Sequence, residues 1–194
     1  MWTAGEHTPR LFRNRCIFQE CRRSWQSEGK DLSFSDMEKL ASACEPLRFR
    51  IDPRSEEFLA PGNMPRRIAD AAEKNGARPE APGEIVRCAY DSLALAVRDV
   101  LRLLEKLRDR RYEALHIVGG GTQAELLMQL ISDACGIPVL AGPVEATAIG
   151  NLAAQMIASG DLADLASARQ LVAQSFELRK YVPRDDVNKR YERA

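Results

Sequence analysis

The stretch 114-ALHIVGGGTQ-123 predicts a buried strand that leads into a tight turn. Residues 114–118 form a short apolar run, and the glycines 119–121 follow it at once. A continuous apolar run of this length is typical of a strand covered on both faces. Helical spacing returns over residues 122–135, and Gly136 is expected to end that helix.

The alternation of strand and helix continues toward the carboxyl end. We expect a second short strand over residues 137–140, followed by helices over residues 145–159 and 165–176, and Gly160 is expected to end the first of these helices. This order predicts a helix-rich α/β fold with parallel strand pairing. Two parallel strands make no stable sheet, so either the first half holds further strands or the chain is part of a larger fold. We expect no complete five-stranded sheet.

The first half of the chain is expected to be helices joined by loops. Four helices are predicted, over residues 11–25, 35–44, 63–76 and 84–108. Ser35 with Glu38 matches a capping box for the second helix, and Asn63 with Pro65 marks the start of the third. The prolines between residues 45 and 64 predict an irregular segment that apolar residues hold on the core.

The composition argues against two classes of partner. Lys and Arg number 28, Asp and Glu number 28, and the resulting net charge of zero provides no field that attracts nucleic acid. No apolar stretch approaches the length of a membrane span, and the first ten residues contain no hydrophobic signal segment. We therefore expect no nucleic-acid partner, no membrane partner and a cytoplasmic location.

The sequence has few side chains that suit metal binding or catalysis. Five cysteines without a CxxC pair, together with two histidines, give no metal-binding pattern, so we interpret the thiols as buried or idle in a reducing compartment. Asp133 and Glu145 are the acidic candidates for proton transfer. A carboxylate in the first turn of a helix usually serves the helix dipole, and a lone acid in a helix is usually solvated. We assign no catalytic and no metal-binding residue.

Two stretches of small residues have both a ligand-binding and a structural interpretation. Glycines 119–121 allow a ligand to lie against the main chain near a helix amino terminus, which suits a nucleotide, but they also suit a plain tight turn. They match neither the dinucleotide fingerprint nor a Walker A loop. The small residues of 141-AGPVEATAIGN-151 allow the close approach of a ligand or of a neighbouring helix.

These stretches resemble the C-terminal domain of the FGGY family of carbohydrate kinases. The run 141-AGPVEATAIGN-151 is similar to the rhamnulokinase branch, whereas a triple-glycine turn is shared more widely. The upstream segments 18-FQECRR-23, 51-IDP-53 and 58-FLAPG-62 also match. The resemblance covers residues 16–183, which would form an incomplete nucleotide-side domain between a divergent segment, 1–15, and a charged tail, 184–194.

The resemblance implies an actin-like ATPase fold of the ribonuclease H-like type, of which this chain would be part of the C-terminal half. It implies binding of ATP or ADP, use of Mg²⁺, and transfer of the ATP γ-phosphoryl group to L-rhamnulose in a complete kinase. By the same resemblance Gly119, Gly120 and Gly121 would line the adenosine pocket. Gln19 would match a glutamine that reaches the nucleotide.

The chain also departs from the family pattern. The base, the phosphate-binding loops and the sugar contacts of the family lie in sequence that precedes the counterpart of Gln19, and Ala124 stands where an asparagine is usual near the adenine. We therefore expect the chain alone to be inactive. The alternative is a non-enzymatic module that self-associates through an uncovered sheet edge or binds another chain, which the arginine-rich start would favour.

Overall fold

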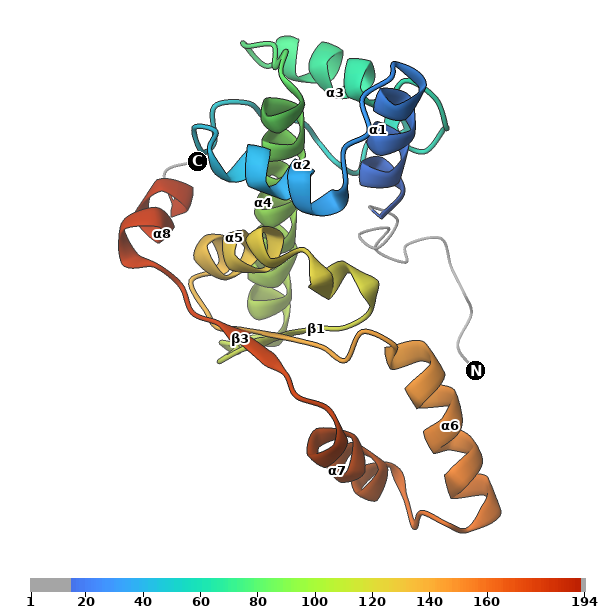
Figure 1. The fold of residues 1–194 in the computed structure, drawn as a ribbon. Helices are drawn as coiled ribbons and strands as arrows, with labels where there is room; N and C mark the ends of the chain where they lie inside the picture. Colours follow the sequence, from blue (N-terminus) through green and yellow to red (C-terminus); the bar gives the residue numbers. More distant parts are fainter. Residues whose placement is uncertain (1–14, 193–194) are drawn as a thin grey trace. The chain divides into compact units, whose positions relative to one another are not determined.

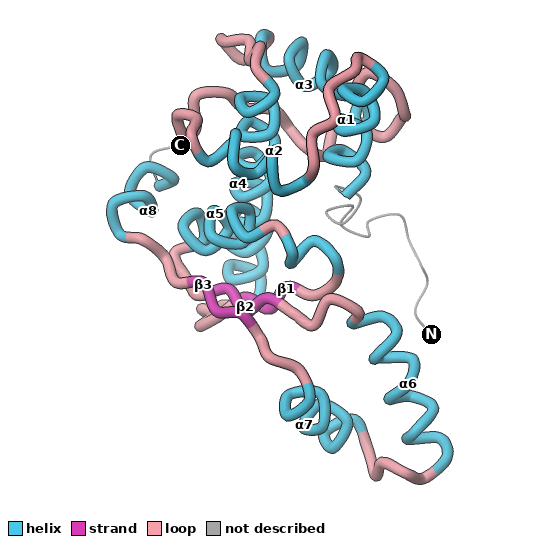
Figure 2. Tube along the Cα trace, viewed as in Figure 1, coloured by secondary structure: helices cyan, strands magenta, loops and turns pink. Residues whose placement is uncertain are grey.

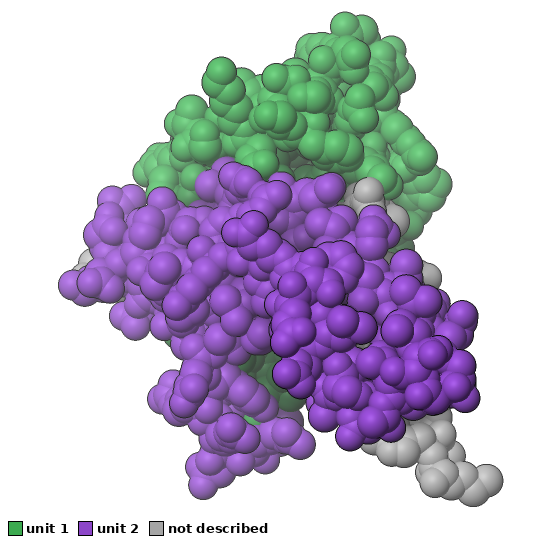
Figure 3. Space-filling model, turned by 60° about the horizontal axis from the view of Figure 1, so that its bottom comes forward, with its two compact units in different colours: residues 1–104, 194 green, residues 105–193 purple. Residues whose placement is uncertain are grey.

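The computed structural model describes residues 15–192 and divides the chain into two compact units. Unit 1 comprises residues 1–104 with residue 194, and unit 2 comprises residues 105–193 (Figure 3). The expected segment 1–15 and the start of the helix expected from residue 11 therefore lie almost wholly outside the described residues. The boundary between the units falls within a long helix.

The described residues of unit 1 form helices joined by loops (Figures 1 and 2). Its elements are α1 (Arg15–Ser27), α2 (Phe34–Ser42), the 3₁₀ turn η2 (Glu56–Phe58), α3 (Met64–Glu73) and α4 (Pro82–Arg108), the last of which runs past the boundary. The described part of the first half thus contains no strand. All four predicted helices are confirmed, although α4 begins two residues before the predicted start because Pro82 occupies its first turn.

Helices α1 and α3 pack against each other over an apolar core in unit 1 (Figure 1). Phe18 of α1 lies against Tyr90 of α4, with 4.7 Å between the ring centroids. Ile68 of α3 is fully buried, as are the neighbouring alanines of the same face. The first half of α4 is buried on nearly every side, so it forms the central element of this unit.

Buried polar groups of α4 hold the irregular segment between α2 and α3. The Asp91 carboxylate accepts hydrogen bonds from the backbone N–H of Leu47 at 2.7 Å and from Nε of Arg87 at 2.9 Å. The Ser92 hydroxyl accepts one from the backbone N–H of Ile51 at 3.0 Å. Backbone groups of a loop need partners when they are buried, and these side chains provide them.

The predicted capping box of α2 is wrong by two residues. Ser33, not Ser35, is the N-cap: its hydroxyl accepts from the Asp36 N–H, and the Asp36 side chain accepts from the Ser33 N–H. Ser35 with Glu38 has the usual glutamate of a capping box, whereas Ser33 with Asp36 has the shorter acidic side chain. The earlier start adds helical hydrogen bonds while still placing Met37 on the buried face. In α3, Asn63 caps the helix as predicted.

Unit 2 contains the strands (Figure 2). Its elements after the last turn of α4 are β1 (Leu115–Ile117), the 3₁₀ turn η3 (Gly120–Gln123), α5 (Glu125–Cys135), β2 (Val139–Ala141), α6 (Ala146–Ser159), α7 (Leu165–Ser175), β3 (Arg179–Tyr181) and α8 (Asp185–Glu192). Gly136 and Gly160 end α5 and α6 in the left-handed conformation, as predicted.

The described sheet has three strands in the order β1-β2-β3. Strands β1 and β2 pair in parallel, with Leu115 opposite Val139, and β3 joins β2 in the antiparallel sense, with Tyr181 opposite Val139. The parallel pair and the absence of a five-stranded sheet from the described residues agree with the prediction. Strand β3 was not predicted, because its three residues are two cations and a tyrosine rather than an apolar run.

Helix α8 packs on α5 through polar groups. Asp133 of α5 is fully buried, and its carboxylate accepts from the backbone N–H of Arg184 at 2.8 Å and from Nη2 of the same residue at 2.5 Å. The side chain of Asn188 donates to the Asp133 carbonyl at 2.7 Å. Tyr191 is fully buried at the other end of α8. The segment 184–194, expected as a charged tail, therefore contains a docked helix.

Candidate functional site

The candidate site begins where β1 ends. Gly119 has a φ of 90° and a ψ of −178°, a conformation that residues with a Cβ adopt rarely. The Thr122 hydroxyl donates to the Gly119 carbonyl at 2.7 Å, and Thr122 is buried. Together with the 3₁₀ turn η3, this hydrogen bond fixes a tight reversal. The predicted helix start at residue 122 is wrong, because η3 occupies residues 120–123 and α5 begins only at Glu125.

The loop after β2 lies directly beside this glycine turn. The Gly142 N–H donates to the Ile117 carbonyl at 2.8 Å, and the Gly119 N–H donates to the Pro143 carbonyl at 3.0 Å. The peptide bond between Gly142 and Pro143 is cis. The two stretches singled out in the sequence thus meet at the carboxyl ends of two parallel strands, which is where open α/β sheets bind ligands.

The backbone of the glycine turn faces open space. A Cβ added at Gly119 or at Gly121 would meet no other heavy atom within 4 Å. Protein atoms therefore leave the space beside the main chain at these two glycines free. Gly121 also has no positive φ, so its lack of a side chain is not required by the backbone conformation. That freedom of space fits the backbone contact with adenosine that the family resemblance implies.

An ion pair occupies the first turn of α5. Glu125 carries the acidic side chain of that turn, and Arg179 of β3 pairs with it. Both side chains are mostly exposed, so solvent screens their attraction. A carboxylate at a helix amino terminus already compensates the helix dipole. This end of α5 is therefore better suited to an uncharged ring system than to a phosphate group. Sequence analysis missed the pair, because its members lie far apart in the sequence.

The other predicted contact, Gln19, belongs to unit 1, whereas the three glycines belong to unit 2. Gln19 is half-buried on α1. Its neighbour Glu20 accepts a hydrogen bond from the Gly62 N–H at 3.3 Å and pairs with Arg23 at 2.6 Å. This carboxylate links α1 to the loop that precedes α3 and so fixes the part of α1 that carries Gln19.

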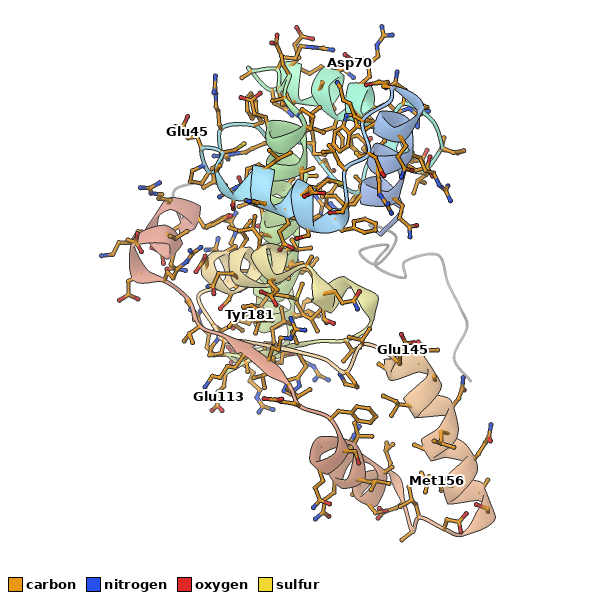
Figure 4. The ribbon with its side chains drawn as sticks, viewed as in Figure 1. Glu45, Asp70, Glu113, Glu145, Met156 and Tyr181 are labelled. Carbon is orange, nitrogen blue, oxygen red and sulfur yellow. The ribbon has the colours of Figure 1, made fainter. Side chains whose placement is uncertain are left out.

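The acidic candidates have structural roles or none. Asp133 is committed to Arg184 and is closed off from solvent. Glu145 sits at the N-cap position of α6 without a side-chain capping bond, and Figure 4 shows it at the first end of that helix. The buried thiols are also unsuited to nucleophilic attack, because burial raises the pKa of Cys88 to about 12 and raises the pKa of Cys21 as well.

The described residues contain no group of three or more His, Cys, Asp or Glu side chains placed to hold a metal ion. Across residues 15–192, no helix combines the length and the apolar character needed to cross a bilayer. The site offered by this chain thus consists of backbone and small side chains, with one exposed ion pair at its margin.

Comparison with known proteins identifies the family. The model of the FGGY family of carbohydrate kinases, C-terminal domain, matches residues 10–159. The chain belongs to this family. It is 41% identical to a rhamnulokinase of Bacteroides thetaiotaomicron over 93% of its own length, and 42% identical to a rhamnulokinase of Enterobacter sp. over 79%. The predicted resemblance to the rhamnulokinase C-terminal domain is confirmed.

Solved structures agree on the fold. The chain superimposes on a xylulose kinase from Rhodospirillum rubrum with a TM-score of 0.61 and 19% identity, covering 93% of this chain and 35% of that one. Plasmodium falciparum glycerol kinase with ADP gives a TM-score of 0.60 at 16% identity, covering 91% and 35%. The chain spans 37% of the Bacteroides relative and 32% of the Enterobacter relative. It is thus the C-terminal portion of a sugar-kinase fold.

Proposed function

We propose that this chain is the nucleotide-side portion of an ATP-dependent kinase that phosphorylates L-rhamnulose in the cytoplasm. The observation that carries the proposal is the glycine turn after β1, which is open at Gly119 and Gly121 and is tied to the loop after β2. The relatives named rhamnulokinase, at 41% and 42% identity, support this sugar over the others that the family phosphorylates.

In the proposed complex, the main chain of Gly119–Gly121 lies against the adenosine. Bound ATP with Mg²⁺ supplies the γ-phosphoryl group and the charge neutralisation that its transfer requires. The residues of this chain position the nucleotide and exclude water from one side of it. They provide no general base in this proposal, since Asp133 is sealed by Arg184.

The 194-residue chain alone is proposed to lack kinase activity. Phosphoryl transfer depends on positioned charges around the γ-phosphate, and the family places those groups in the part of the enzyme that this chain does not span. Adenosine contacts then provide nearly all of the affinity, so we expect a dissociation constant for ADP of roughly millimolar. Phosphorylation of L-rhamnulose by the purified chain, above a heat-killed control, would refute this part.

Calorimetric titration with ADP tests the site itself. Gly121→Val places a branched side chain in the open space without opposing a positive φ, so the fold is retained while the ligand is blocked. We expect at least a tenfold loss of affinity. Ala166→Val is the control, because Ala166 also lies in unit 2, is exposed and lies outside both candidate ligand-binding stretches. Equal ADP affinity in both variants and the parent would show that the turn is only structural.

A further inference from the structure

Strand β3 and helix α8 belong to one segment that follows α5 from its amino end to its carboxyl end (Figure 1). We call this segment, residues 177–192, the β3–α8 strap. All of its residues are described, and among them only Tyr191 is buried. The strap therefore has almost no apolar core, and polar contacts must account for most of its attachment.

Polar side chains on one face of α5 make these contacts. They lie at intervals of four, seven and eight residues from the first, which places them on the same side of a helix: Glu125, Gln129, Ser132 and Asp133. Glu125 pairs with Arg179 of the strap. The Gln129 amide donates to the Val182 carbonyl at 2.8 Å, and the Ser132 hydroxyl donates to the Tyr181 carbonyl at 3.2 Å. Asp133 accepts from the backbone N–H of Arg184 at 2.8 Å.

The first residues of the strap lie against both loops of the candidate site. A Cβ added at Gly142, in the loop after β2, would meet the Leu178 side chain at 3.4 Å. Arg179 stands opposite Ala141, the last paired residue of β2, and reaches Glu125 in the first turn of α5. That turn comes directly after η3 and the glycines. The strap thus connects the loop after β2 with the helix that continues the glycine turn.

We propose that the β3–α8 strap positions the glycine turn, so that docking of α8 and binding of a nucleoside diphosphate favour each other. Helix α5 carries the turn at its amino end and Asp133 near its carboxyl end, and the strap binds it at both places. An effect of one binding event on another is reciprocal in free energy. Only the nucleotide part of this inference rests on the proposed function.

Two observations fit such a role. The family model ends at residue 159, so the strap lies outside the matched region and adds contacts that this region does not contain. The cations that hold the strap are also accessible to water, since the side chains of Arg179 and Arg184 are 58% and 50% exposed. Elements that open separately from the rest of a fold have few buried apolar contacts. The strap can therefore undock while the sheet remains folded.

Hydrogen exchange without ligand tests the positioning. Arg184→Ala removes the side-chain bonds to Asp133 and touches neither loop. We expect exchange to accelerate about tenfold or more over residues 185–192 and also at the amides of Gly119 and Gly142, which bond across the two loops. Asp164→Ala is the matched control, because Asp164 caps α7 in the same unit but does not contact the strap. It should leave both loop amides at the parent rate.

Each result of this comparison decides the positioning. Faster exchange in α8 alone, or in neither place, would overturn it. Equal acceleration of the loop amides by Asp164→Ala would show a general loosening of unit 2 and would overturn it as well. If Arg184→Ala does not fold, Arg184→Lys is measured in the same way, because it keeps the charge but loses the planar fork that binds a carboxylate.

ADP added to the parent chain tests the coupling. At ADP concentrations well above the dissociation constant, exchange over residues 185–192 should slow by about fivefold or more, which is the lower end of usual coupling between two sites. Bound ADP that leaves α8 at the ligand-free rate would overturn the coupling. A parent chain that binds no ADP would contradict the proposed function, whereas the exchange of Gly119 and Gly142 in Arg184→Ala would still decide whether the strap positions the turn.

Discussion

Replacing Asp133 by alanine should release α8 from α5 while leaving the sheet in place. The carboxylate accepts from Arg184 through its backbone N–H at 2.8 Å and its side chain at 2.5 Å, and from Nε2 of Gln129 at 3.0 Å. The same contact raises the pKa of the Arg184 guanidinium above its ordinary value. The substitution removes all of these bonds at once, because an alanine side chain has no hydrogen-bond acceptor.

The expected cost follows from the exposure of each donor. A hydrogen bond to a buried charge is worth about 1.5–3 kcal/mol, but the Arg184 side chain is half exposed and regains water when its partner is lost. The backbone N–H of Arg184 loses its acceptor, which costs about 1–3 kcal/mol, whereas the Gln129 amide still donates to the Val182 carbonyl at 2.8 Å. We therefore expect a total of about 2–4 kcal/mol. Asn188 and the buried Tyr191 still hold α8, so the helix loosens rather than unfolds permanently.

Native-state hydrogen exchange is the suitable measurement, since it reports opening of α8 separately from the rest of the chain. Each 1.4 kcal/mol is a factor of ten, so exchange over residues 185–192 should accelerate by about 30-fold to about 700-fold. Asp161→Asn, at an exposed carboxylate of the same unit, is the control and should change little. Exchange in Asp133→Ala within threefold of the parent would refute the reasoning.

Two further predictions concern titration. Iodoacetamide at pH 8 should leave Cys21 and Cys88 unmodified until the chain unfolds, because both thiols are buried and burial raises their pKa values; mass spectrometry of early modification at either site would contradict this. The Glu84 carboxylate accepts from the backbone N–H groups of Glu80 and Ala81, which lowers its pKa below 4.5. Its contribution is therefore present above pH 4.5 and is lost as the pH falls through the lowered value. Circular dichroism should show weaker acid sensitivity in Glu84→Gln than in the parent.

The sequence predicted those turns and helix ends that are determined by neighbouring residues of the chain. The glycine turn followed from an apolar run that ends in three glycines, and the ends of α5 and α6 followed from Gly136 and Gly160. The start of α3 followed from Asn63. In each case the signal and the structure it produces lie within a few residues of each other.

Elements held by distant polar contacts could not be predicted in the same way. Strand β3 forms because β2 offers an unpaired edge, and Arg179 and Lys180 give no apolar signal for it. Helix α8 depends on a carboxylate in α5 about fifty residues earlier, so its charged sequence resembles a solvated tail. The contact between the glycine turn and Pro143 likewise required the pairing of β1 with β2.

The hydrogen bonds between the glycine turn and the loop after β2 decide which positions can change without disturbing the sheet. The bonds from Gly142 to Ile117 and from Gly119 to Pro143 extend the ladder beyond the last paired residues. Among the described residues, the bond from Gly119 to Pro143 is the last backbone hydrogen bond between these two segments. Insertions or replacements beyond Pro143 can therefore accumulate without shifting the register of β1 on β2. At Gly119 and Gly142, where φ is 90° and 122°, a side chain would oppose the backbone conformation and so disturb the loop contact itself.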